Sequence, residues 1–204
     1  MNILLTGFEK FGKEKMNPSW DAIRDLDGAV INNVRLFCKQ LPVSFKRAPT
    51  IVKELLGSIR PRYYIAFGLA GGRNTVTVER VAINIMDSTK PDNDNYTPKD
   101  EMIFENGPVA YFATVPIKDI IKVLRGKGIP AIISNSAGTL VCNTVFYSGL
   151  YYANKLGLET KVGFIHLPYD TAQVLDKDKP SLPLSLIKNG IMELINFLIE
   201  MKNR

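Results

Sequence analysis

The stretch AIISNSAGTLVCNTVFYSGLYYANKL, residues 131–156, decides the fold class of this 204-residue chain. Its first four residues are an apolar run that favours a buried strand, and the small residues that follow make a turn through Ala137-Gly138. From Val141 to Leu156 the chain has the length and composition of a helix. Because a strand that turns directly into a helix is the building unit of α/β proteins, this stretch predicts the same unit elsewhere.

Working outward, short apolar strands alternate with helices along the chain. The predicted strands are 3–6, 34–41, 63–67, 76–85, 131–134 and 162–165, and the predicted helices start at Asn17-Pro18 or cover 49–59, 118–124, 141–156 and 184–201. Strands that are apolar on both faces are typical of a parallel sheet covered by helices on both sides. No repeat or linker divides the sequence. We therefore predict one α/β/α domain over residues 1–204, with a mostly parallel, mixed sheet.

The composition argues against several classes of protein. Lys and Arg outnumber Asp and Glu by 26 to 20, but they are scattered, and no basic block with interleaved aromatics points to nucleic-acid binding. No apolar stretch approaches the roughly 20 residues that a membrane span needs, and no Cys/His spacing is typical of zinc. Nothing at the N-terminus resembles a signal peptide. We therefore expect a cytoplasmic protein whose two cysteines stay reduced.

Four segments that are candidates for a functional site follow directly on predicted strands. They begin at Gly7, Gly68, Asn135 and His166. Sites in open α/β sheets gather at the carboxyl ends of strands, where loops lead into helices. If the four strands are parallel neighbours, these segments converge on one edge of the sheet.

Cys142 is the candidate nucleophile. It falls in the first turn of the helix predicted from Val141, where unpaired N–H groups and the helix dipole favour a thiolate. The same N–H groups would stabilise an oxyanion that forms on an attacked carbonyl. The alternative is that Cys142 is only a small buried residue. Cys38, in the middle of a predicted strand, is expected to pack in the core.

His166 is the only histidine and so the only imidazole base. At the end of a strand it is placed to reach a neighbouring helix start as general base and acid, although a structural histidine is the alternative. Glu79, between β-branched residues, is the candidate carboxylate that orients the ring, and an ion pair with Arg80 or Arg73 is the alternative. The remaining acidic candidates are expected to shape loops: Asp87, Asp92 and Asp94.

Five separated groups of residues cover most of the chain. They are LLTGFEKFG (4–12) with NPS (17–19), GLAGGR (68–73) with ERVAIN (79–84), PDN (91–93) with ENGP (105–108), SNSAGTLVCN (134–143), and HLP (166–168). Together, and in this order, they resemble the pyroglutamyl peptidase type I family, also called pyrrolidone-carboxylate peptidases, which are cysteine peptidases.

The resemblance implies a reaction and a set of residues. It implies an enzyme that removes an N-terminal pyroglutamyl residue from peptides, needs no cofactor or metal, and often forms a homotetramer. It maps the nucleophile onto Cys142, the base onto His166 and the orienting carboxylate onto Glu79, as the residues themselves already indicate. The pocket for the lactam ring maps onto six residues: Phe8, Phe11, Asn17, Leu69, Gly71 and Val141.

Two positions depart from the family pattern. An Arg is usual in the run before Pro91, where this chain has Thr89 and Lys90, and Gln is common in place of Leu69. Either departure would change efficiency more than it would abolish activity. Other readings stay open: a different α/β hydrolase, a phosphorylase, or an inactive binding module of the same fold. The polar segment 88–107 is either a lid or part of a subunit interface.

Overall fold

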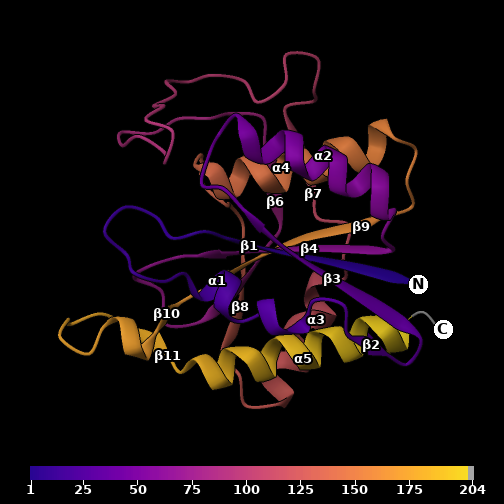
Figure 1. Ribbon diagram of the computed structural model, residues 1–204, viewed down its shortest axis with the longest axis vertical. Helices are drawn as coiled ribbons and strands as arrows, with labels where there is room; N and C mark the ends of the chain where they lie inside the picture. The colour runs from indigo at the N-terminus through magenta and orange to yellow at the C-terminus, as the bar shows by residue number, and fades with distance from the viewer. Residues whose placement is uncertain (202–204) are drawn as a thin grey trace.

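The computed structural model describes residues 1–201 and contains a central seven-stranded sheet in the order β2-β3-β1-β4-β9-β5-β8 (Figure 1). Its strands are β1 Asn2–Phe8, β2 Val30–Ile31, β3 Val34–Leu41, β4 Tyr63–Leu69, β5 Val76–Glu79, β8 Ala131–Ser134 and β9 Lys161–Leu167. Two small ladders flank it: β6 Val81–Ile83 with β7 Ala110–Phe112, and β10 Tyr169–Asp170 with β11 Ser181–Leu182. The helices are α1 Pro18–Asp21, α2 Arg47–Ile59, α3 Ile117–Gly126, α4 Val141–Lys155 and α5 Leu184–Met201, with 3-10 turns at Arg24–Leu26 and Thr171–Gln173.

Helices cover both faces of the sheet. In Figure 1, α2 and α4 lie above it, and α1, α3 and α5 lie below. Alternate residues of β1 point to opposite faces of the sheet. Ile3 and Leu5 therefore join the core between the sheet and helices α3 and α5, whereas Leu4 joins the core between the sheet and helices α2 and α4. The predicted three-layer fold with a mixed, mostly parallel sheet is confirmed. Within residues 1–201 no helix is long and apolar enough to cross a membrane.

The strands do not all run in the expected direction. β1, β3, β4 and β9 are parallel to one another, but β5 pairs antiparallel with β9, and β8 follows the direction of β5. Gly7, Gly68 and His166 are each the penultimate residue of a parallel strand, so these three do meet at one edge. The turn at Asn135 leaves β8 in the opposite direction. The condition that all four strands are parallel neighbours therefore fails for β8, and the segment that follows it comes to Gly68 and His166 only at Cys142.

Two local predictions also need correction. The extended stretch 76–85 is split at Arg80, whose N–H donates to Ser134 O and whose carbonyl accepts from Ala113 N, so that β6 leaves the main sheet and pairs with β7. The strand 131–134 was expected to be buried, but β8 lies at the sheet edge and Ile132 is 44% exposed. Asn17 caps α1 as predicted, with its side chain accepting from Ser19 N.

Candidate active site

Cys142 is the second residue of α4, and the structure anchors this helix start firmly. Leu140, at the N-cap, offers no side-chain hydrogen bond, so no side chain at that position occupies the first N–H groups of the helix. Asn143 is fully buried and pins the same turn to β6: its Oδ1 accepts from Ile83 N at 3.0 Å, and its Nδ2 donates to Ile83 O and Ile85 O. The sequence alone assigns no role to Asn143. Its position as a polar residue near the start of a helix was the signal that could have indicated a structural contact there.

Gly68 allows the thiol to approach the sheet. A Cβ atom at this position would lie 2.9 Å from the Cys142 sulfur and equally close to the Phe164 ring. Any larger residue would push α4 away from β4. The glycine is therefore required by close approach, and it places the sulfur over the carboxyl end of β4, next to His166 on the paired strand β9.

His166 and Glu79 form a buried pair. The ring Nδ1 lies 2.7 Å from Glu79 Oε1, with Glu79 fully buried and His166 5% exposed. Thr77 is directly opposite His166 in the antiparallel ladder, so Glu79, two residues further on, lies on the same face at the diagonal position. Because Nδ1 is engaged by the carboxylate, Nε2 is the ring nitrogen left for the thiol.

The charges of the site stabilise an imidazolium. Burial alone would lower the pKa of His166, but the charge and hydrogen bond of the Cys142 thiolate, together with Glu79, raise it to about 9. Burial likewise opposes ionisation of Glu79, yet its hydrogen bond to His166 and the charge of the ring keep the pKa of this carboxyl below its ordinary value. The arrangement favours a charged imidazolium beside a charged carboxylate.

Glu79 also forms an ion pair with Arg73, one of the two arginines that the sequence suggested as its partner. Arg73 Nη1 lies 3.1 Å from Glu79 Oε1, and Thr77 Oγ1 also contacts this oxygen, at 3.4 Å. The guanidinium of Arg80 instead contacts Asn135 Oδ1. The pair with Arg73 and the contact with His166 therefore coexist, since one carboxylate oxygen accepts both.

A cavity of about 550 Å³ opens beside Cys142. Five of the six residues predicted for the lactam pocket are on its wall: Phe8, Phe11, Asn17, Leu69 and Val141. Gly71 is not, because the chain turns after β4 and Gly71 packs against the Tyr169 ring. The wall includes further residues that sequence reasoning did not connect with a pocket: Glu14, Met16, Val43, Phe45, Asp87, Ser88, Pro91, Asp92, Thr139 and Leu140. Thr89 and Lys90, where the family usually has an Arg, line it as well.

The other candidates behave as ordinary structural residues. Cys38 is 1% exposed in β3, and burial raises the pKa of its thiol to about 12, so the predicted core packing is confirmed. Asp92 accepts three backbone N–H groups and Asp94 pairs with Arg47, which are the loop-shaping roles predicted for them. Asp87 N donates to Thr139 O, and the Thr139 hydroxyl donates to Asp87 O, just before α4.

An α/β domain with a thiol at a helix start and a buried imidazole–carboxylate pair beside it has the arrangement of a cysteine peptidase. The comparisons agree with this class. The sequence profile of the pyroglutamyl peptidase family matches residues 1–201, and the chain belongs to that family.

Individual relatives span almost the whole chain. A pyrrolidone-carboxylate peptidase of Thermococcus onnurineus is 51% identical over 92% of this chain and 93% of its own length. The crystal structure of a pyrrolidone carboxyl peptidase from Pyrococcus furiosus has a TM-score of 0.95 at 39% identity, covering 98% of this chain and 99% of the other. That of the Thermococcus litoralis enzyme has a TM-score of 0.93 at 41% identity, covering 100% and 96%.

Proposed function

We propose that this protein is a cysteine exopeptidase that hydrolyses the bond after an N-terminal pyroglutamyl residue. One observation carries the proposal: a buried His166–Glu79 pair stands at the carboxyl edge of the sheet beside a thiol at a helix start, and a cavity opens onto that thiol. The names of the relatives and the family match supply the substrate class.

In the proposed mechanism Cys142 is the nucleophile. Its thiolate attacks the carbonyl carbon of the pyroglutamyl residue, and the carbonyl oxygen becomes an oxyanion. The N–H groups of the first turn of α4 are not used by a capping side chain and point along the helix axis, so they stabilise this charge. A backbone oxyanion site of this kind does not depend on the side chain at position 89, where the family usually has an Arg.

His166 then moves the proton. As an imidazolium it protonates the leaving amine, the C–N bond breaks, and a thioester remains on Cys142. The neutral imidazole next takes a proton from water, which attacks the thioester and releases pyroglutamate. Glu79 holds Nδ1, keeps the ring in the orientation that presents Nε2, and stabilises the positive charge at each step.

The cavity explains why a pyroglutamyl ring is preferred. The ring is compact and uncharged, so apolar contacts with Phe8, Phe11 and Val141 suit its faces, while Asn17 and the backbone at Leu69 are available for its N–H and C=O. One hydrogen of the Asn17 amide donates to Glu9 O, which leaves the other for the substrate. An ordinary N-terminal residue would have to bury a charged amine, which costs several kcal/mol.

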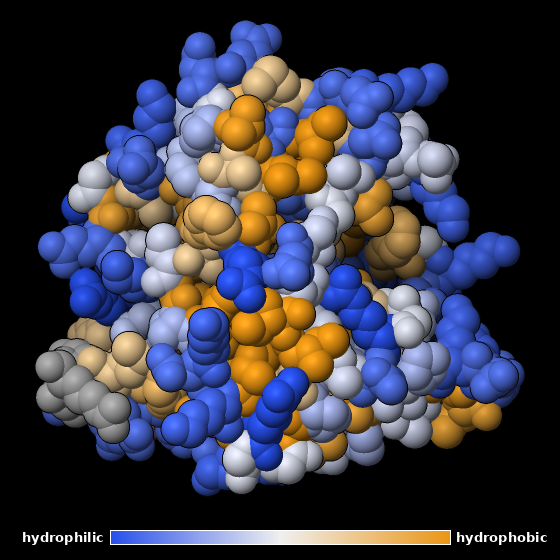
Figure 2. All heavy atoms as spheres, turned by 180° about the vertical axis from the view of Figure 1, so that it is seen from behind, coloured by the Kyte–Doolittle hydropathy of each residue, from blue (hydrophilic) through white to orange (hydrophobic). Residues whose placement is uncertain are grey.

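A homo-oligomer and a cytoplasmic location complete the proposal. Figure 2 shows apolar side chains gathered on the face opposite to that of Figure 1. Exposed apolar residues lie on the edge strand β8 and on or next to the β6–β7 ladder, among them Ile132, Val109 and Phe112. The backbone of Arg80 connects these two elements through hydrogen bonds to Ser134 and Ala113. Such a surface suits a second copy of this chain. A catalytic thiol acts in its reduced form, which the reducing cytoplasm maintains.

The test is hydrolysis of a fluorogenic pyroglutamyl amide, with the matching prolyl and glutamyl amides and the Cys142→Ala variant in parallel. We expect turnover of the pyroglutamyl amide alone, independent of phosphate, and its loss in the variant. Turnover that requires phosphate would indicate a phosphorylase. No turnover by the folded protein would support a binding module, and Cys142 should then be alkylated at the rate of an ordinary thiol.

A further inference from the structure

Three segments that are far apart in the sequence share the wall of the cavity. Phe8 and Phe11 belong to the first, Val43 and Phe45 to the second, and residues 87–92 to the third. Beyond Phe8, at the end of β1, these segments contain no helix or strand of the central sheet. No ladder of backbone hydrogen bonds joins these segments to one another, so their relative positions depend on side-chain contacts and on single backbone hydrogen bonds.

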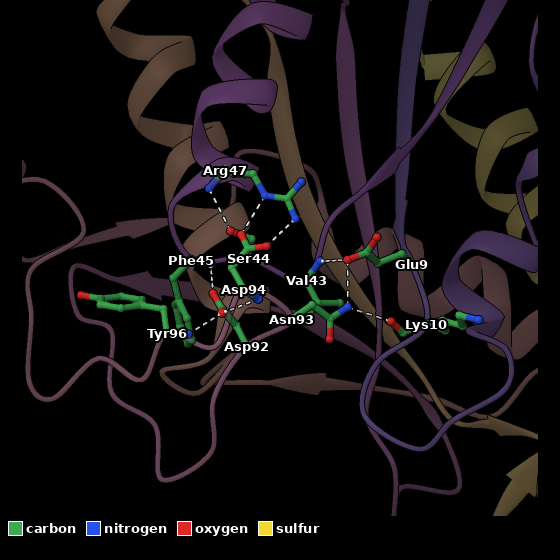
Figure 3. A network of polar contacts seen from close by, with 10 residues as sticks. All are labelled: Glu9, Lys10, Val43, Ser44, Phe45, Arg47, Asp92, Asn93, Asp94 and Tyr96. Carbon is green, nitrogen blue, oxygen red and sulfur yellow. Dashed lines mark hydrogen bonds and ion pairs between the residues drawn. The ribbon is translucent and has the colours of Figure 1, made fainter.

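Asp92 makes the first set of these contacts. Its side chain is buried, and Oδ2 accepts from Phe45 N at 2.9 Å (Figure 3). Oδ1 accepts from Asp94 N and Tyr96 N, both at 2.9 Å. One carboxylate thus closes the turn in the third segment and joins that turn to the second segment.

Glu9 and Asn93 make the second set. Glu9 Oε1 accepts from Val43 N at 3.1 Å and from Asn93 Nδ2 at 2.8 Å, and Asn93 Nδ2 also donates to Lys10 O at 2.9 Å (Figure 3). Asn93 N donates to Val43 O as well. Glu9 Oε1 and the side-chain amide of Asn93 therefore connect all three segments.

We propose that Glu9, Asp92 and Asn93 are positioning residues that hold the three wall segments in the geometry that binds the pyroglutamyl ring. The inference rests on the proposed function. A wall that is already ordered spares the substrate the entropy of ordering it, so loosening the wall weakens substrate binding. Cys142 and His166 belong to α4 and β9, and the side-chain hydrogen bonds of Glu9, Asp92 and Asn93 go to neither element, so the chemical step is unaffected. Loss of binding without loss of chemistry raises KM and leaves kcat unchanged.

The main variant is Asn93→Asp. It places a carboxylate against Glu9 in place of the 2.8 Å hydrogen bond and removes the donor to Lys10 O. We expect KM for the pyroglutamyl amide to rise about tenfold, with kcat within about twofold of wild type. Asn93→Ala removes the same donors without the repulsion, so it should raise KM in the same direction by a smaller factor. The double variant Glu9→Gln/Asn93→Asp removes the repulsion between two carboxylates, but it does not restore the acceptor for Val43 N and the donor to Lys10 O together, so it should recover only part of the lost affinity.

Asp94→Asn is the matched control, since it lies in the same loop and weakens the exposed ion pair with Arg47 but leaves the contacts of Glu9, Asp92 and Asn93 in place. Its KM should stay within about twofold of wild type. The proposal is overturned if Asn93→Asp and Asn93→Ala both keep the wild-type KM, if they lower only kcat and the unfolding temperature, or if the double variant is no better than Asn93→Asp. Failure of the wild-type protein to cleave the amide would instead overturn the proposed function, so the two failures are distinguishable.

Discussion

Removal of the Cys142 thiol should change the titration of His166, and the sequence makes this easy to observe. The chain contains one histidine, so its ring nitrogens give unambiguous signals in nuclear magnetic resonance spectra of protein labelled with ¹⁵N-histidine. The pKa of this ring is raised to about 9 against the effect of burial, and the largest cause of the rise is the negative charge of Cys142. Cys142→Ala removes that charge and leaves Glu79 in place.

The expected size of the change follows from Coulomb's law. Two unit charges about 4 Å apart, at an effective dielectric constant of about 20, interact by about 4 kcal/mol. One pKa unit corresponds to about 1.4 kcal/mol, so loss of the thiolate should lower the pKa of His166 by about 3 units. We therefore expect the ring of Cys142→Ala to titrate near pH 6, because burial still disfavours the imidazolium.

The assay is a titration of both proteins across about pH 5 to 10, the interval that contains the ordinary and the raised pKa. Glu79→Gln is the comparison variant, because it keeps the thiolate and should lower the pKa of His166 by less than Cys142→Ala does. A pKa near 9 in Cys142→Ala would refute the reasoning, since the thiolate would then not be its cause. A wild-type pKa near 6.5 would refute it equally, because no thiolate–imidazolium pair would exist.

Three further predictions concern stability. Gly68→Ala should lower kcat and cost about 1–3 kcal/mol of unfolding free energy, because the new Cβ would lie 2.9 Å from the Cys142 sulfur; a variant as stable and active as wild type would contradict this. Asn143→Ala should cost about 1–3 kcal/mol in chemical denaturation, since the partly buried Ile83 N–H loses its acceptor; a loss below about 1 kcal/mol would count against the anchoring role. The folded pKa of His166, about 9, exceeds its unfolded value of 6.5, so its contribution to stability is full below that value and is lost as the pH rises through 9. Unfolding free energies that do not fall over this interval would rule that contribution out.

The catalytic candidates could be predicted because each is chemically rare in its setting. Cys142 follows a turn of small residues and begins a helix, and His166 is the only imidazole in the chain. Glu79 is a charged residue in a β-branched run, which requires a buried partner. The structure brings these three side chains together. Their catalytic roles stay predictions until the variants are measured.

The pocket was harder to predict, because its wall depends on contacts between distant segments. Leu69 and Gly71 are two residues apart in the sequence, yet only Leu69 lies on the wall, since a turn decides which groups face a cavity. Val43 and Phe45 gave no signal at all. The place of Phe45 depends on Asp92, which is 47 residues away, and no periodic pattern records such a contact.

The direction of β5, by contrast, could have been predicted from the chain length between strands. Only six residues, 70–75, connect Leu69 at the end of β4 to Val76 at the start of β5. A parallel connection needs a crossover of a dozen residues or more, so β5 has to return antiparallel to β4 and to its parallel neighbour β9. That reversal places Thr77 opposite His166 and Glu79 at the diagonal position on the same face. The short connection after β4 is therefore the reason that the imidazole has a carboxylate within 2.7 Å.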